Sequence, residues 1–253
     1  MRLLSCVLCC ALVVNFTRAD EPKPAQAAGN WVTIKGQVVF PEGKPIPNRA
    51  ALDVNQDKGH CLKAGPILDE STIVNPKNRG IKNVVVWLRP DDAKRKPAEV
   101  VIDQPCCMFV NRVTCARVGD TIVVKNPAPV VHNFFWSSDS SGNFNANVPA
   151  KGEWKMPNAL AAEVGPVQYK CTIHPWMAGY VRVFDHPYYA VTDADGKFEI
   201  QNAPAGKFRI VYWHESGLRG GAKGRFGEAI NVVGAKNPAG PTMEMKPTEY
   251  DVR

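Results

Sequence analysis

The sequence lacks the features of several common protein classes. After the first 19 of its 253 residues, no apolar run is long enough to span a bilayer as a helix. No later segment keeps a sustained helical period of apolar residues. The basic residues do not gather in one block, and aromatic residues are not interleaved with them. Transmembrane helices, a helical fold and nucleic acid binding are therefore not expected.

The first 19 residues are typical of a secretion signal. They combine a positive start at residues 1–2, a short apolar run at 3–14 and small residues at the cleavage positions within 17–19. A lipoprotein anchor fits less well, because the three cysteines of this stretch lie inside the apolar run rather than after it. We predict that residues 1–19 are a signal peptide and residues 20–30 a leader. The mature protein is then exported, to the periplasm, the cell surface or the extracellular space.

Export makes the cysteine count informative. Five cysteines follow the predicted signal: Cys61, Cys106, Cys107, Cys115 and Cys171. Because disulfides form in exported proteins, two disulfides and one metal-bound thiolate would account for all five. A bridge between the neighbours Cys106 and Cys107 would be strained, so each is expected to pair elsewhere. Of the three possible pairings we favour Cys61 with Cys107 and Cys106 with Cys115, which leaves Cys171 unbridged.

The remaining chain alternates short apolar runs with turns, which is typical of β-strands. Its 21 prolines and 20 glycines are scattered as turn punctuation. Strand-like runs lie at residues 31–40, 84–88, 115–126, 130–136, 166–173 and 188–217, with a charged break at 89–98. We therefore predict an all-β fold of the sandwich type.

One short segment concentrates metal-binding side chains. Cys171, His174 and Met177 fall within the seven residues CTIHPWM, directly after a strand-like run. Mononuclear blue (type 1) copper sites use one Cys, two His and a weak axial Met. The second imidazole must come from elsewhere, and His132 is the natural candidate because it follows a β-run and a proline-containing corner. We predict one copper ion held by these four residues.

These motifs resemble the cupredoxins, the family of plastocyanin, azurin and amicyanin. The spacing Cys-x2-His-x2-Met is that of amicyanin, and the segment DTIVVKNP followed by HN is similar to the family's approach to its first ligand. The resemblance covers residues 97–187 and implies a Greek-key β-sandwich with a type 1 copper site. In that family an Asn after the first His bonds to a Thr or Ser after the Cys. Asn133 and Thr172 hold these positions, which implies a link between the two ligand loops.

The flanking segments, residues 31–96 and 188–253, carry a second resemblance. The stretch IKGQVVFPEGKPIPN and the hairpin motif TDADGKF resemble the carboxypeptidase regulatory-like module, a small transthyretin-like sandwich. Because the two motifs lie far apart, the resemblance implies that the copper-type region is inserted between two halves of one sandwich. The phrases HPWM and VFDHPYYAVT also resemble secreted bacterial proteins labelled methylamine-utilisation or cupredoxin-like, a label that establishes no role with methylamine.

Two details of the ligand loop lead to further expectations. Amicyanin-like loops often carry Pro two residues after the Cys, where this chain has Ile173. Ile173 has a backbone N–H, which we expect to donate a second hydrogen bond to the sulfur. His174 stands beside Pro175 and Trp176, so we expect it near solvent, with His132 deeper in the protein.

The predicted function is one-electron transfer by copper to or from an unidentified partner protein. No nucleophile–base pair or paired carboxylates indicate an enzyme, and five histidines are too few for a multicopper oxidase. Two alternatives stay open. One is a cell-surface module that binds carbohydrate or protein and holds copper structurally, and the other is copper delivery or storage.

Overall fold

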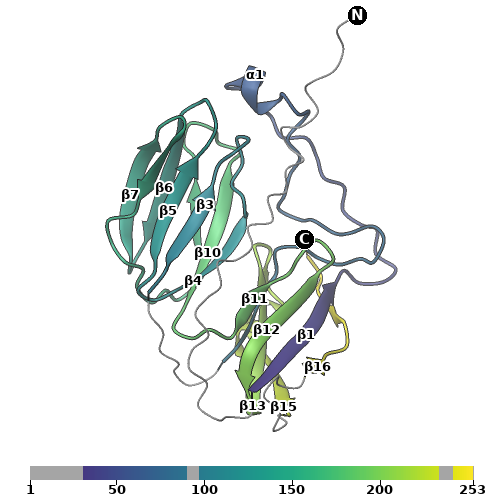
Figure 1. Ribbon diagram of the computed structural model, residues 1–253. Helices are drawn as coiled ribbons and strands as arrows, with labels where there is room; N and C mark the ends of the chain where they lie inside the picture. The colour runs from purple at the N-terminus through teal and green to yellow at the C-terminus, as the bar shows by residue number, and fades with distance from the viewer. Residues whose placement is uncertain (1–30, 90–96, 234–241, 253) are drawn as a thin grey trace, which may run out of the picture.

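The computed structural model describes residues 31–89, 97–233 and 242–252 (Figure 1). The predicted signal and leader lie outside these residues. Within the described ranges no helix has the length and apolar character needed to cross a bilayer. The structure is almost entirely β-structure, which confirms the predicted all-β fold.

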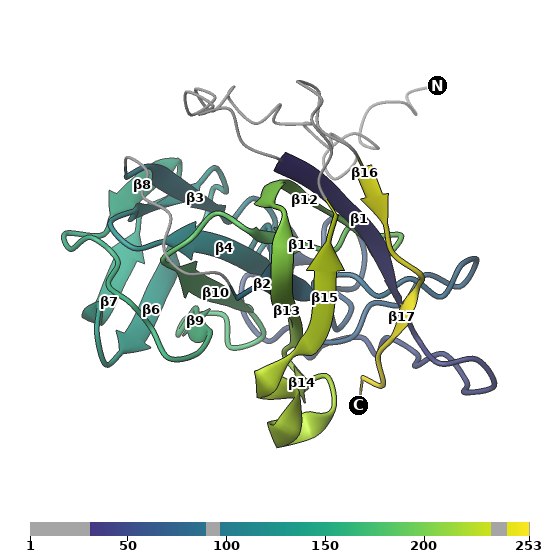
Figure 2. The ribbon, with the colours of Figure 1, turned by 90° about the horizontal axis from the view of Figure 1, so that it is seen from below.

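Strands from both ends of the described chain pair with each other and form what we call the split module. Its strands are β1 (Trp31–Val39), β2 (Val85–Leu88), β11 (Tyr189–Val191), β12 (Lys197–Pro204), β13 (Gly206–His214), β14 (Gly217–Leu218), β15 (Glu228–Val232), β16 (Thr242–Glu244) and β17 (Thr248–Glu249), with the 3-10 helix η1 at Gly221–Phe226. β1 pairs antiparallel with β12 and parallel with β16 and β17. β2 lies between β11 and β13. Figure 2 shows β1 beside β16, and β13 beside β15.

The residues between these halves form a second sandwich, the inserted module. Its strands are β3 (Glu99–Asp103), β4 (Val113–Arg117), β5 (Thr121–Asn126), β6 (His132–Ser138), β7 (Gly142–Val148), β8 (Gly152–Lys155), β9 (Val167–Lys170) and β10 (Ala178–Phe184). One sheet has the order β4-β10-β9-β6-β7 and the other has the order β3-β5-β8. Alternating side chains of both sheets, such as Ile122, Phe134, Trp136 and Tyr169, fill the core between them.

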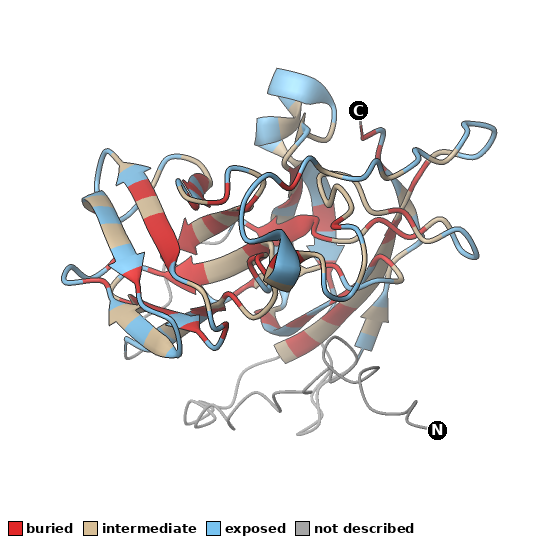
Figure 3. Ribbon diagram, turned by 90° about the horizontal axis from the view of Figure 1, so that it is seen from above, coloured by how far each residue is buried: buried red, intermediate tan, exposed pale blue. Residues whose placement is uncertain are grey.

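A loop segment from the first half of the chain lies on the inserted module rather than on the split module. This segment, residues 50–69, contains the short helix α1 (Lys58–Cys61), whose outer side is exposed (Figure 3). Its buried side chains, Val54, Cys61 and Ile67, join the core of the inserted module. We call residues 50–69 the cover segment, because of its position over the site described below.

The two modules share an apolar junction that explains the unbroken apolar runs of β2 and β13. On β2, Val86 and Leu88 face the core of the split module, whereas Val85 and Trp87 face the inserted module. On β13, Ile210 and Tyr212 face the core of the split module, whereas Val211 and Trp213 face the inserted module. Across the junction lie Val113 of β4 and Phe184 of β10. Both faces of β2 and of residues 210–213 of β13 are therefore covered, and these stretches need no polar alternation.

A buried ion pair crosses the same junction. Arg112, just before β4, donates hydrogen bonds of 2.6 and 2.8 Å to the two carboxylate oxygens of Glu215 in the split module. The side chains are 13% and 9% exposed. A third guanidinium hydrogen bond, of 3.2 Å, reaches the carbonyl of Ala178 at the start of β10. The pair thus ties the split module to the strand that follows the predicted ligand loop.

We expect Glu215→Ala to lower the free energy of unfolding by about 3 kcal/mol, because the Arg112 guanidinium stays buried without its carboxylate. Urea denaturation measures this loss. The matched control is Glu199→Ala, which removes a half-exposed ion pair with Lys35 and is expected to cost less than about 1 kcal/mol. Equal losses in the two variants would contradict a stabilising role for the buried pair.

Candidate metal centre

The predicted ligands lie at one end of the inserted module because of how its strands pair. His132 is the first residue of β6, and Cys171 follows directly after β9. β9 pairs antiparallel with both β6 and β10, so the loop after β9 lies beside the start of β6. That loop is closed by hydrogen bonds from the Cys171 N–H to the Met177 carbonyl (3.1 Å) and from the Met177 N–H to the His174 carbonyl (2.9 Å).

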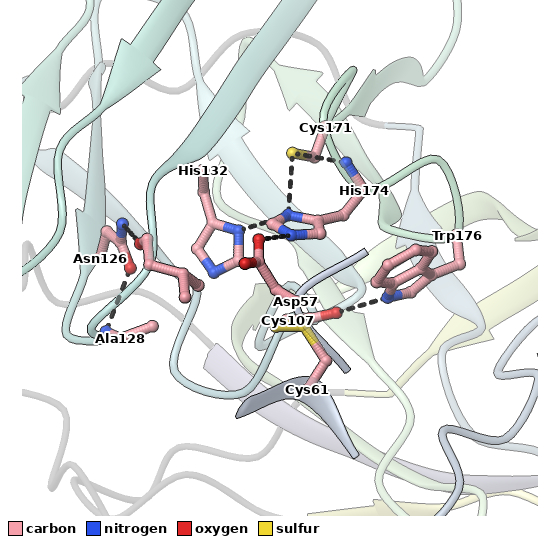
Figure 4. Close-up of a disulfide and its surroundings, with 10 residues drawn as sticks. Asp57, Cys61, Cys107, Asn126, Ala128, His132, Cys171, His174 and Trp176 are labelled. Carbon is pink, nitrogen blue, oxygen red and sulfur yellow. Dashed lines mark hydrogen bonds and ion pairs between the residues drawn. A yellow bond between two sulfur atoms is a disulfide. The ribbon is translucent and has the colours of Figure 1, made fainter. Parts of the chain in front are cut away.

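Three donor atoms converge at this end (Figure 4). His132 Nδ1 and His174 Nδ1 are 2.9 Å apart, and Cys171 Sγ lies 3.7 Å from His174 Nδ1. All three atoms lie within 4.8 Å of one another. The side chains of these residues and of Met177 are 1% exposed or less. A thiolate and two imidazole nitrogens in one buried cluster fit the donor set of a type 1 copper ion.

The sulfur of Cys171 accepts backbone hydrogen bonds from both loops. The Asn133 N–H lies 3.2 Å from Sγ and the His174 N–H lies 3.4 Å from it. The expectation that Ile173 supplies the second N–H is wrong, because the turn directs the N–H of the following residue at the sulfur. The Ile173 side chain instead packs against the core.

Asn133 links the two ligand loops. Its Oδ1 accepts a hydrogen bond of 3.3 Å from the backbone N–H of Thr172. Its side-chain amide donates to Asn145 Oδ1 on β7 at 2.8 Å. The link at these two positions therefore uses the backbone N–H of Thr172, which any residue except proline would supply.

The cover segment closes the site from outside. Asp57 Oδ2 lies 2.9 Å from Nε2 of His174, and the disulfide between Cys61 and Cys107 ties the segment to the inserted module. Trp176 donates a hydrogen bond of 3.0 Å from Nε1 to the Cys107 carbonyl. The expectation that His174 lies near solvent is wrong: this histidine is 0% exposed, because the cover segment lies over it.

Asp57 is the residue of the site that the sequence did not reveal. It precedes His174 by 117 positions and belongs to no recognisable motif. The available signal was the disulfide. A pairing of Cys61 with Cys107 places the residues just before Cys61 beside the residues that follow β3.

The predicted disulfides are half right. The bridge between Cys61 and Cys107 is confirmed. The pairing of Cys106 with Cys115 is wrong, since no disulfide joins them. The reason is topological: Cys115 lies on β4 with its side chain against the junction core, whereas Cys106 is half-buried in the turn after β3, next to the Cys107 that bonds to Cys61.

Hydrogen bonds set the protonation of the ligand cluster. Burial by itself would raise the pKa of Cys171, but hydrogen bonds from His132, His174 and two backbone N–H groups outweigh it and lower the pKa to about 6. Burial would lower the pKa of His174, but hydrogen bonds to Cys171 and Asp57 outweigh it and raise the pKa. The sulfur is therefore a thiolate at neutral pH, the form that binds metals.

No protein-family model and no curated protein matches this chain. Among solved structures, the chain is similar to a reduced amicyanin mutant, with 24% identity and a TM-score of 0.30 over 34% of this chain and 82% of that one. An oxidised amicyanin mutant has 18% identity and a TM-score of 0.30, and the match covers 39% of this chain and 98% of that one. A purple cupredoxin from Nitrosopumilus maritimus has 21% identity and a TM-score of 0.28, and the match covers 34% of this chain and 99% of that one.

In the metal-free protein we expect the ultraviolet absorbance of the Cys171 thiolate to appear with a midpoint near pH 6. An ordinary thiol titrates near pH 8.5, that is, about two to three units higher. Cys171→Ser should remove this step. Cys115 should add none near pH 6, because burial raises its pKa. A Cys171 midpoint at or above about pH 8.5 would contradict the hydrogen-bonded cluster.

Proposed function

We propose that this chain is an exported type 1 copper protein that carries single electrons. One observation carries the proposal: His132 Nδ1, Cys171 Sγ and His174 Nδ1 lie within 4.8 Å of one another and are buried. Met177, the proposed weak axial ligand, is buried at the end of the same loop. This combination of donors is typical of electron-transfer copper sites. A bound copper ion would supply reversible exchange of one electron between Cu(I) and Cu(II).

The residues around the donors favour rapid exchange, because they hold the donors without the metal. The thiolate is fixed by two backbone N–H groups, and the loops are joined through Asn133. The disulfide fixes the cover segment on the outer side. A site that is already ordered changes little between oxidation states, which keeps the cost of reorganisation small.

Burial of the donors also argues for a carrier rather than an enzyme. His132, Cys171 and His174 are each 1% exposed or less, so a substrate could not reach a metal held between them. An electron needs no such contact and passes through the surrounding protein. We therefore propose a partner protein that exchanges electrons with this chain, and no chemical turnover of a small molecule.

We expect the mature protein to bind one copper ion and to be intensely blue as Cu(II), because the colour arises from the bond between thiolate and copper. Cys171→Ser should abolish the colour even where Cu(II) still binds through the imidazoles. Visible absorption and metal analysis measure both effects. Cys115→Ser is the matched control and should stay blue, because that thiol faces the junction core. A colourless Cu(II) form of the wild type would overturn the proposal.

A second experiment separates electron transfer from copper delivery. In stopped-flow mixing with a redox reagent, a carrier is expected to be oxidised and reduced repeatedly with its copper retained. Mixing the Cu(I) form with a chelator should remove the metal far more slowly, because the cover segment closes the site. Metal transfer as fast as electron transfer would favour delivery.

A further inference from the structure

We propose that Asp57 is a positioning residue for the metal centre, which fixes the tautomer of His174 and stabilises the oxidised metal. The part that concerns the metal rests on the function proposed above. The part that concerns the tautomer applies to the metal-free protein. Figure 4 shows the Asp57 carboxylate directed at the His174 ring from the side opposite Cys171.

The hydrogen bond between Asp57 and His174 has a defined direction. A carboxylate accepts hydrogen bonds and donates none, so the 2.9 Å contact between Asp57 Oδ2 and His174 Nε2 requires a proton on Nε2. Nδ1 is then the nitrogen left to bind a metal, once it gives up the proton that it shares with Cys171 Sγ. Nδ1 is the atom that faces Cys171 Sγ and His132 Nδ1. Asp57 thus selects the tautomer that can donate to a metal.

The chain holds Asp57 in place from both sides. Three residues before it, Val54 is buried in the core of the inserted module, and four residues after it, Cys61 is bound to Cys107. Asp57 itself has φ 45° and ψ 33°, a left-handed conformation that is uncommon for residues other than glycine. This conformation begins α1 and is maintained by the anchors on both sides. Such backbone geometry often occurs where a side chain must be aimed.

The charge of Asp57 also acts on the site. The Asp57 side chain is 41% exposed, whereas His174 is 0% exposed, so the carboxylate lies at the boundary between solvent and the buried site. A carboxylate on the far nitrogen of a ligand imidazole makes that imidazole a stronger electron donor. Stronger donation and the nearby negative charge both stabilise Cu(II) more than Cu(I). Asp57 therefore lowers the reduction potential of the site.

A different role for Asp57 would be to hold the cover segment closed without affecting the metal. The two roles predict different results. A purely structural role would leave the reduction potential unchanged in a variant whose cover segment stays closed. A positioning role would change the tautomer of His174 in Asp57→Ala and the reduction potential in Asp57→Asn.

The metal-free protein gives the first test, through long-range 1H–15N NMR spectra of the histidine rings. We expect His174 to be protonated on Nε2 in the wild type and to lose that preference in Asp57→Ala. Asp53→Ala is the matched control, because Asp53 lies exposed on the same segment and should leave His174 unchanged. An identical His174 tautomer in the wild type and Asp57→Ala would overturn the proposal.

The copper-loaded protein gives the second test, by voltammetry. Asp57→Asn keeps an oxygen acceptor but removes the negative charge. We therefore expect this variant to favour Cu(I) over Cu(II) about tenfold relative to the wild type, which raises the reduction potential by about 59 mV. Asp53→Asn makes the same change of charge on the same segment and should shift the potential much less. Equal shifts in both variants would overturn the proposal. Failure of the wild type to bind copper would instead refute the proposed function, and the tautomer test would still decide the role of Asp57.

Discussion

Strand β9 is only four residues long, yet its place between β6 and β10 decides where the donor atoms lie. Pairing with β6 brings His132 beside the loop that follows β9, and pairing with β10 returns the chain after Met177. The backbone bonds from Asn133 and His174 to the Cys171 sulfur depend on this pairing. The pairing of these strands therefore determines where the donor atoms meet, and the side chains of His132, Cys171 and His174 supply those atoms.

The junction between the modules gives the sheet a second support. β4 and β10 face the core of the inserted module on one side and β2 and β13 on the other, so both faces of β4 and β10 are covered. Arg112 connects the junction to the start of β10 through its bonds to Glu215 and to the Ala178 carbonyl. The split module thus stabilises the strand that follows the ligand loop, although it contributes no ligand.

Local sequence patterns were sufficient for the all-β fold and for the grouping of His132, Cys171 and His174, whereas the bridge between Cys61 and Cys107 was the favoured one of several possible pairings. Strand patterns and ligand spacing are short-range signals, and such signals survive in a single sequence. The cover segment carries no such signal, because its position depends on a disulfide and on Val54 and Ile67 packing into a distant core. The exposure of His174 and the role of Asp57 could not be predicted for that reason. The Cys115 pairing failed because the split module covers the face of β4 that carries Cys115, and no local pattern in the sequence indicates this covering.

The split arrangement also sets an order for folding. β1 begins at the first described residue, but Gly36 pairs with Phe198, so the entire inserted module must be synthesised before that pairing can form. Pairing of strands so far apart in the sequence adds to the entropic cost of loop closure and slows folding. Once the inserted module is folded, its ends lie near each other, because Pro97 lies beside Gly119 and the Val118 N–H donates to the Phe184 carbonyl. Because the inserted module has its own sheets and core, we expect it to fold first and the split module to form around it.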